Sequence, residues 1–528
     1  MPPADVSFFQ RNSSMRSYDY LIVGAGSAGC VLAARLSEDP NVSVALLEAG
    51  DEDNAPEIKV PAMALQLAKT KYDWDFYSEP EPGLNGRSVP LARGKGIGGT
   101  SSINAMVYMR GNPLDFDRWE QDGASGWSYR EMLRYFIRSE DNNRWENEFH
   151  GRSGPLSVQD ARYTHPLSER FIGAAQQAGH AYNEDFNGGT QMGAGYFQVT
   201  QRDGERCSAA HAYLHPVRER PNLHVLTGAL VLRVLLEGTR ATGVTIFRCG
   251  REETLRAERE VILSAGTYSS PQTLMLSGIG PADQLKSFGI APVVDLPVGE
   301  DLQDHVLAPV SYCSNEPSFL RAGSAEDIEL YRTQKLGPLT SNVIGAGAFL
   351  STRGDSSLPN IELYMAPALV SLHTPPTADG FSIAISLIDT TSRGRLTLRS
   401  ARPDAKPRIL TNVLTTPEDQ STIFAGIKAA MQIAAQSKLA EVRTSDFLVP
   451  QSESDSDMRE YVRNFAMTDR HPSSTCGIGR VVDPELRVLG VERLRVVDAS
   501  VMPTIPHGNL NAVVIAMAEK AADLLLKR

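Results

Sequence analysis

A glycine-rich turn near the start of the chain constrains its fold more than any other feature. The run Tyr18–Val23 is apolar and β-prone, the turn Gly24–Gly29 follows at once, and Ser27–Leu36 is compatible with a helix. A second apolar run, Val42–Leu47, ends in Glu48. This is the pattern GxGxxG inside a strand–turn–helix–strand unit, with an acidic residue after the second strand. It predicts an α/β domain of the Rossmann type that binds an adenine dinucleotide.

Each position of this turn has a physical role. Gly24 permits the tight turn, Gly26 lets a pyrophosphate approach the backbone, and Gly29 lets helix and strand pack closely. The start of the helix offers free N–H groups and a positive dipole end to the phosphates. Glu48 can accept hydrogen bonds from both ribose hydroxyls. The alternative is that the glycines serve packing only, and the pattern by itself does not separate FAD from NAD.

Size, charge and cysteine content exclude several classes of protein. The chain has 528 residues, enough for more than one domain, and a net charge of −11, which argues against nucleic-acid binding. Its five cysteines are widely spaced and form no CxxC pair, so we expect neither a disulfide framework nor a zinc site. Only His211 and His215 have HxxxH spacing, and no third ligand accompanies them. We therefore expect no metal.

The location of the protein is predicted from its apolar segments. No window reaches about 18 uninterrupted apolar residues, so no transmembrane span is expected. Residues 1–17 form a polar arm that lacks the apolar core of a signal peptide. Together with the cysteine content, this predicts a cytoplasmic protein.

Polar segments further along the chain supply candidates for cofactor contacts. Gly98–Ser102 is a small-residue loop whose N–H and hydroxyl donors can approach a flat ring or a phosphate, or else form a flexible turn. Arg93 and Lys95 precede it and face either a cofactor or solvent. Near the C-terminus, His471 in isolation reads as a structural histidine. Asn509, with Asn511, reads as a candidate cap for a helix over 511–526.

Taken together, these segments resemble the glucose–methanol–choline (GMC) oxidoreductase family, closest to its bacterial alcohol dehydrogenase and choline dehydrogenase branch. The resemblance spans nearly the whole chain and rests on segments in a fixed order: Tyr18–Gly29, Arg93–Asn104, Gly266–Pro271 with Leu274–Gly280, Val298–His305, His471-Pro472, Val497–Ser500 and Asn509–Asn511. Arg470 departs from the family, where many relatives carry an aromatic or small residue. The substrate therefore cannot be inferred by analogy.

The family pattern implies a set of site residues. His471 would be the general base and Asn509 its partner on the substrate oxygen, with His507 as the rival base. FAD would be bound non-covalently, because Ile103 stands where some relatives carry the histidine that attaches the flavin. The residues predicted to bind FAD are Gly24, Gly26, Ser27, Ala28, Gly29, Glu48, Gly99, Thr100, Asn104, Ala105, Met106, Val107, Val231, Asp498, Ala499, Asn509 and Leu510.

The reaction implied by the family is oxidation of a primary alcohol to an aldehyde, by proton abstraction and hydride transfer to flavin N5. Oxygen or a quinone would reoxidise the flavin, and a quinone would place the protein at the periphery of the inner membrane. The alternatives are other chemistry of the same family, of the hydroxynitrile lyase or photodecarboxylase type, and a non-catalytic flavin-binding relative. The retained His471–Asn509 pair argues against a decarboxylase.

The resemblance also implies two interleaved domains. One is the Rossmann-type FAD-binding domain, and the other is an α+β substrate-binding domain built on an antiparallel sheet. The FAD-binding domain is predicted over 15–158, 212–306 and 466–528, and the substrate domain over 159–211 and 307–465. The last segment would carry the catalytic residues.

Overall fold

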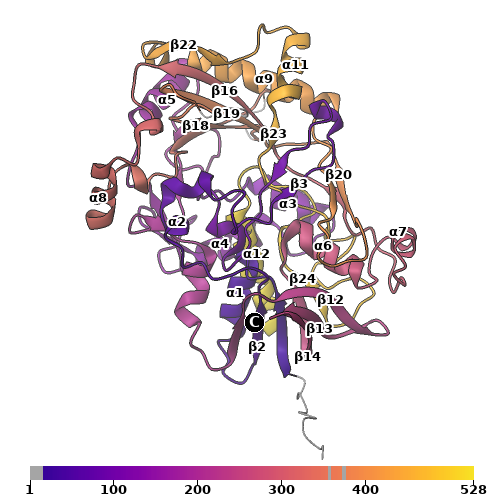
Figure 1. Cartoon of the computed structure of the whole chain (residues 1–528). Helices are drawn as coiled ribbons and strands as arrows, with labels where there is room; N and C mark the ends of the chain where they lie inside the picture. The colour runs from indigo at the N-terminus through magenta and orange to yellow at the C-terminus, as the bar shows by residue number, and fades with distance from the viewer. Residues whose placement is uncertain (1–15, 355–357, 371–375, 528) are drawn as a thin grey trace, which may run out of the picture.

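Two seven-stranded sheets form the framework of the protein (Figure 1). The computed structural model describes residues 16–354, 358–370 and 376–527. Most of the polar arm, and the domain start predicted at residue 15, lie outside the described residues.

The first sheet contains the strand–turn–helix–strand unit. In spatial order its strands are β11 (Leu223–Leu226), β2 (Val44–Leu47), β1 (Arg16–Val23), β14 (Arg251–Leu263), β13 (Arg240–Arg248) and β12 (Leu230–Glu237), with β24 (Leu494–Val496) beside β14. The strands from β11 to β14 pair in parallel, as does β24 with β14. β14, β13 and β12 form an antiparallel meander. This confirms the predicted Rossmann-type domain.

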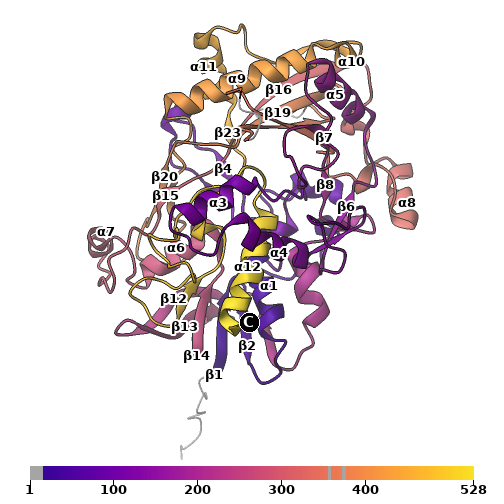
Figure 2. The ribbon, with the colours of Figure 1, turned by 180° about the vertical axis from the view of Figure 1, so that it is seen from behind.

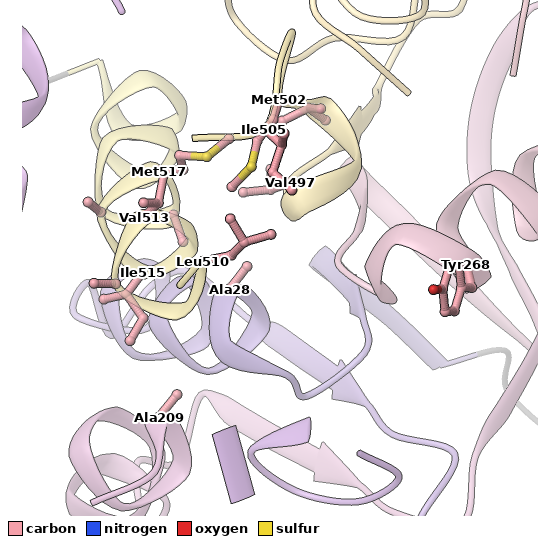
Figure 3. Packing of buried hydrophobic residues seen from close by; sticks show 14 of the residues in the cluster. Ala28, Ala209, Tyr268, Val497, Met502, Ile505, Leu510, Val513, Ile515 and Met517 are labelled. Carbon is pink, nitrogen blue, oxygen red and sulfur yellow. The ribbon is translucent and has the colours of Figure 1, made fainter. Parts of the chain in front are cut away.

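Helices from opposite ends of the chain cover this sheet (Figure 2). α1 (Ser27–Leu36) packs against α12 (Asn511–Leu526), and α4 (Tyr129–Ser139) packs on α12. Arg35 of α1 donates to both carboxylate oxygens of Glu519 on α12, which is fully buried. Figure 3 shows Leu510, just before α12, beside Ala28 of α1. The start of α12 therefore lies next to the glycine-rich turn.

The second sheet is antiparallel throughout its described pairs. In spatial order its strands are β22 (Arg443–Leu448), β16 (Val306–Ser314), β19 (Gly380–Leu387), β18 (Ile361–Ala366), β17 (Ala346–Leu350) and β7 (Gly193–Tyr196), with β23 (Met467–Thr468) beside β16. Every residue of β18 and β19 is buried. The helices α9 (Pro417–Ala434) and α5 (Pro166–Gln177) pack on this sheet (Figure 1). This is the expected α+β region.

Shorter elements connect the two sheets. The helices are α2 (Pro56–Lys59), α3 (Pro113–Gln121), α6 (Gly266–Leu276), α7 (Ala282–Ser287), α8 (Ala325–Gln334), α10 (Ser437–Ala440) and α11 (Asp455–Phe465). The strands are β3 (Phe76–Tyr77), β4 (Pro90–Leu91), β5 (Glu140–Asn142), β6 (Leu156–Asp160), β8 (Gln198–Val199), β9 (Gln201–Arg202), β10 (Glu205–Arg206), β15 (Glu300–Leu302), β20 (Gly394–Thr397) and β21 (Arg408–Leu410). None of the described helices is both long enough and apolar enough to span a bilayer.

The strands of the two sheets alternate along the sequence. The first sheet takes its strands from 16–47, 223–263 and 494–496, and the second from 193–196, 306–387, 443–448 and 467–468. β23 joins the second sheet although it lies within the last predicted segment of the FAD-binding domain. We propose the five-segment division as a description of the domains.

Candidate active site

A cavity of about 900 Å³ extends from the glycine-rich turn to the second sheet. Gly24, Gly26 and Ser27 line it on the side of the first sheet, and Tyr364 of β18 and Ala384 of β19 line it on the other. This volume is at the upper end of the range typical of small-molecule sites.

The glycine-rich turn leaves room over the start of α1. Gly26 is the N-cap, and no side chain caps the helix there. A Cβ at Gly26 would approach only one atom, the Ser264 carbonyl oxygen at 4.0 Å, so the space toward the cavity is open. By contrast, a Cβ at Gly24 would lie 2.5 Å from the Ser264 oxygen, and one at Gly29 would lie 1.9 Å from the Gly24 oxygen. The turn thus fits the approach of a pyrophosphate to the helix N-terminus.

Glu48, at the end of β2, is buried and fixes the backbone around this turn. Its Oε2 accepts from Ala25 N at 2.9 Å, and its Oε1 accepts from Gly50 N at 2.8 Å and Gly96 N at 3.0 Å. Burial raises the pKa of Glu48, and these N–H bonds oppose that rise. A carboxylate has about four acceptor sites, so these three bonds leave about one site for a further donor, such as a ribose hydroxyl.

All the residues predicted to bind the cofactor line this cavity, with the exception of Gly29. Gly29 instead lets α1 pack against the turn, because its backbone lies so close to the Gly24 carbonyl oxygen that no side chain would fit. Arg93, Lys95 and Arg470 also line the cavity.

The predicted catalytic pair meets on the cavity wall. His471 lies in the loop after β23, and Asn509 lies just before α12. His471 Nε2 and Asn509 Nδ2 are 3.2 Å apart, and the His471 side chain is 15% exposed. Capping of α12 by Asn509 or Asn511, the alternative to a catalytic role for Asn509, is not observed. Leu510 is the N-cap, and the Asn511 amide oxygen accepts from Ser27 Oγ at 2.6 Å.

The side chains of Tyr364 and Asp469 complete the cavity wall next to Asn509. Asn509 Nδ2 donates to Tyr364 Oη at 3.2 Å, and Tyr364 donates to Asp469 Oδ2 at 3.1 Å. Ser386 Oγ also donates to Asp469 Oδ2, at 2.8 Å. Sequence reasoning missed Tyr364, because a tyrosine in a buried strand carries no separate signal.

The loop that carries His471 is held by charged neighbours. His471 N donates to Asp304 Oδ1 at 2.7 Å, and Arg93 Nη2 donates to the Arg470 carbonyl oxygen. Burial lowers the pKa of His471, and Arg93 and Arg470 lower it further, against the opposing charge of Asp469. His471 is therefore neutral near pH 7 and able to accept a proton.

His507, the rival base, has a different environment. Its Nδ1 donates to Asp115 Oδ1, its Nε2 lies 3.7 Å from Asp389 Oδ1, and the residue is 3% exposed. Burial opposes charge on this ring, but Asp115 and Asp389 raise the pKa of His507 to about 9. A histidine that is already protonated near neutral pH cannot act as a base.

Comparison with known families identifies the protein. The N-terminal GMC oxidoreductase model matches residues 18–307, and the C-terminal GMC oxidoreductase model matches residues 390–518. The chain belongs to the GMC oxidoreductase family. GMC oxidoreductases bind FAD and act on CH–OH groups, so this chain is an FAD-dependent oxidoreductase that oxidises alcohols.

Individual relatives match over nearly the whole chain. An alcohol dehydrogenase [acceptor] of Pseudomonas putida is 41% identical, with 97% of this chain and 96% of that protein aligned. The mitochondrial choline dehydrogenase of Mus musculus is also 41% identical, with 96% of this chain and 89% of that protein aligned. The crystal structure of pyridoxine 4-oxidase from Mesorbium loti superposes with a TM-score of 0.90 at 33% identity, covering 97% of this chain and 99% of that one.

Proposed function

We propose that this GMC oxidoreductase oxidises an uncharged primary alcohol to an aldehyde, with His471 as the base. The pair formed by His471 Nε2 and Asn509 Nδ2 supports this proposal. Bound FAD supplies the acceptor for the hydride that leaves the alcohol carbon. An alcohol oxygen that contacts both side chains would donate its proton to His471 Nε2 and accept a hydrogen bond from Asn509 Nδ2, in place of the bond between the two side chains.

The acid–base properties of the pair suit this reaction. An alcohol releases hydride readily only as its hydroxyl proton is removed, and a neutral imidazole can accept that proton. Asn509 does not titrate, so it orients the oxygen without competing for the proton. The residues predicted to hold FAD, apart from Gly29, line the same cavity, which supports binding of the cofactor beside this pair.

The second-sheet side of the cavity is apolar, which favours a substrate without charge. Six of its lining residues are Leu307, Pro309, Ile344, Leu369, Ala384 and Met467. The carboxylates on the described cavity wall are already engaged: Glu48 by backbone N–H groups, Asp469 by hydroxyls, Asp498 by Ser270, and Asp404 by Arg402. A quaternary ammonium such as choline would gain no free carboxylate and would meet the charge of Arg470.

Anaerobic bleaching of the flavin tests this proposal. We expect aliphatic and aromatic primary alcohols to reduce the flavin of the purified protein, and choline to do so far more slowly at equal concentration. Choline turnover equal to that of simple alcohols would contradict the choice of substrate. No reduction by any alcohol would contradict the function itself.

The electron acceptor is tested separately with alcohol-reduced enzyme. We propose oxygen or a quinone, since the relatives include both an oxygen-dependent choline dehydrogenase and a dehydrogenase with an unspecified acceptor. Mixing the reduced protein with oxygenated buffer, or anaerobically with a soluble quinone, shows which one restores the yellow colour.

A further inference from the structure

The hydrogen bonds around His471 have a defined direction, because they end on a carboxylate. Asp469 Oδ2 can only accept, so the hydroxyl of Tyr364 donates to it. The lone pair of that hydroxyl then accepts from Asn509 Nδ2, which fixes the orientation of the Asn509 amide. The same Nδ2 lies 3.2 Å from His471 Nε2. His471 Nε2 is therefore the acceptor and carries no proton.

The proton of neutral His471 must then lie on Nδ1. This atom is 3.0 Å from Nδ1 of His305, and the two rings meet edge to face at 86°. A bond between two ring nitrogens needs one donor and one acceptor. Since His471 Nδ1 carries the proton, His305 Nδ1 is the acceptor and His305 keeps its proton on Nε2.

His305 is held in place for this role. It lies between β15 and β16 and is fully buried, and its carbonyl oxygen accepts from Asp469 N at 2.8 Å. The backbone N–H of Ser473 donates to the backbone carbonyl oxygen of Gln303 at 2.9 Å, so the loop with His471 runs antiparallel to residues 303–305. Burial, followed by the neighbouring His471 and His507, holds the pKa of His305 well below its usual value. His305 therefore stays neutral and offers a lone pair.

Two other arrangements fit these distances less well than a hydrogen bond from His471 to His305: a metal site, and a direct hydrogen bond from His471 to Asp469. One possible ligand atom from each of His305, Asp469 and His471 lies within 4.8 Å of the other two, a spacing that a metal ion could bridge. Two nitrogens on one tetrahedral zinc would be about 3.3 Å apart, whereas these lie at hydrogen-bond distance, 3.0 Å. Asp469 Oδ2 lies 3.5 Å from His471 Nδ1, farther than His305, so it contributes charge rather than the main hydrogen bond.

We propose that His305 is a positioning residue that fixes His471 in the Nδ1–H tautomer, so that Nε2 faces the substrate as the proton acceptor. The inference rests on the proposed function. In the reaction, the O–H bond of the alcohol breaks and an Nε2–H bond forms on His471. The Nδ1–H of the resulting imidazolium stays bonded to the His305 lone pair, and no proton passes to His305.

Two substitutions at position 305 separate positioning from packing. His305→Leu removes the acceptor, whereas the amide oxygen of His305→Asn can replace Nδ1. For His305→Leu we expect the rate of flavin reduction to fall roughly 10- to 100-fold. This is part of the roughly 10²- to 10⁴-fold rate acceleration that a positioned general base contributes. The KM should change little, and His305→Asn should recover most of the rate. His180→Leu, a half-buried histidine outside the cavity lining, is the matched control and should react like wild type.

The pH profile gives a second readout. Loss of the acceptor destabilises the imidazolium, so the pKa that governs kcat/KM should fall in His305→Leu and recover in His305→Asn. The other groups that face the two rings stay in place in both variants: Asp469, Asp304, Asp389, Arg93, Arg470 and His507. Equal rates of flavin reduction and equal pH profiles in wild type and His305→Leu would overturn the inference. Asp469 alone would then be enough to hold His471 in its reactive form.

A spectroscopic test does not depend on activity. In protein labelled with ¹⁵N-histidine, we expect the shifts of His471 to show a protonated Nδ1 and a bare Nε2, and this preference should be lost in His305→Leu. A bare Nδ1 on His471 in the wild type would overturn the inference even if His305→Leu does not fold. If no alcohol reduces the wild-type flavin, the proposed function fails while this spectrum still tests the tautomer.

Discussion

His471 combines the properties that a base needs, since it is neutral, lies on the cavity wall and faces Asn509. We expect His471→Ala to keep its FAD and to lose flavin reduction by roughly 10²- to 10⁴-fold, the usual effect of removing a general base. Asn509→Ala should lose less, since it removes one hydrogen bond. Stopped-flow reduction measures both rates, with the flavin spectrum as the control for cofactor content. Reduction of His471→Ala at the wild-type rate would rule out this assignment.

Ile103 bears on how the cofactor is attached. It lines the cavity and has no nucleophilic atom, so we expect FAD to be bound non-covalently. Precipitation with acid should release all the yellow colour into the supernatant. Colour that stays with the precipitated protein would reveal a covalent bond through some other residue.

Glu48 has two roles, since it holds three backbone N–H groups and leaves one acceptor site toward the cavity. We expect Glu48→Ala to weaken FAD binding by at least one hydrogen bond to a charged acceptor, roughly 1.5–3 kcal/mol. Titration of the apoprotein with FAD measures this loss. The reduction rate of the remaining holoenzyme should be unchanged, and equal FAD affinity in the two proteins would contradict the prediction.

At the scale of elements, Gly29 shows why the glycine-rich turn tolerates no side chain. Its Cβ would lie 1.9 Å from the Gly24 oxygen, so we expect Gly29→Ala to push α1 away from the turn and cost about 1–3 kcal/mol or more. Both the urea midpoint and the FAD content should fall. Gly189→Ala, where a Cβ would meet nothing within 4 Å, is the control and should change neither.

The first βαβ unit and α12 were predictable from sequence because their signals are local. Helix α1 spans Ser27–Leu36 and α12 spans Asn511–Leu526, as expected, since apolar spacing and turn residues define both. The partners of His471 were not predictable, because Tyr364 and Ser386 come from strands far away in sequence. His305 was part of a recognised segment, but its contact with His471 depends on how two loops pair.

At the scale of the whole molecule, His507 joins parts of the chain that carry the two sheets. It contacts Asp115 of α3 and lies near Asp389, just after β19, and Asp389 is also paired with Arg353. We expect His507→Ala to destabilise the protein by about 3–5 kcal/mol, because the buried carboxylate of Asp115 loses its charged partner. Urea denaturation measures it, with the exposed His224→Ala as the control.

The same cluster predicts how stability depends on pH. The pKa of His507 is raised to about 9 in the folded protein, above the ordinary value of 6.5. Its contribution is therefore complete below about pH 6.5 and is lost as the pH rises through 9. The difference in melting temperature between wild type and His507→Ala should be large at pH 6.5 and small at pH 10. A difference that does not change with pH would show that His507 is not charged.

The alternation of the two sheets along the chain has a consequence during synthesis. β1 and α1 emerge from the ribosome early, but β24, α12, His471 and Asn509 lie within the last 58 residues. These parts are synthesised only after every strand of the second sheet, the last of which is β23. The early βαβ unit must therefore wait, with one face of α1 uncovered, until α12 is released. The dinucleotide site is thus complete only after the second sheet has been synthesised.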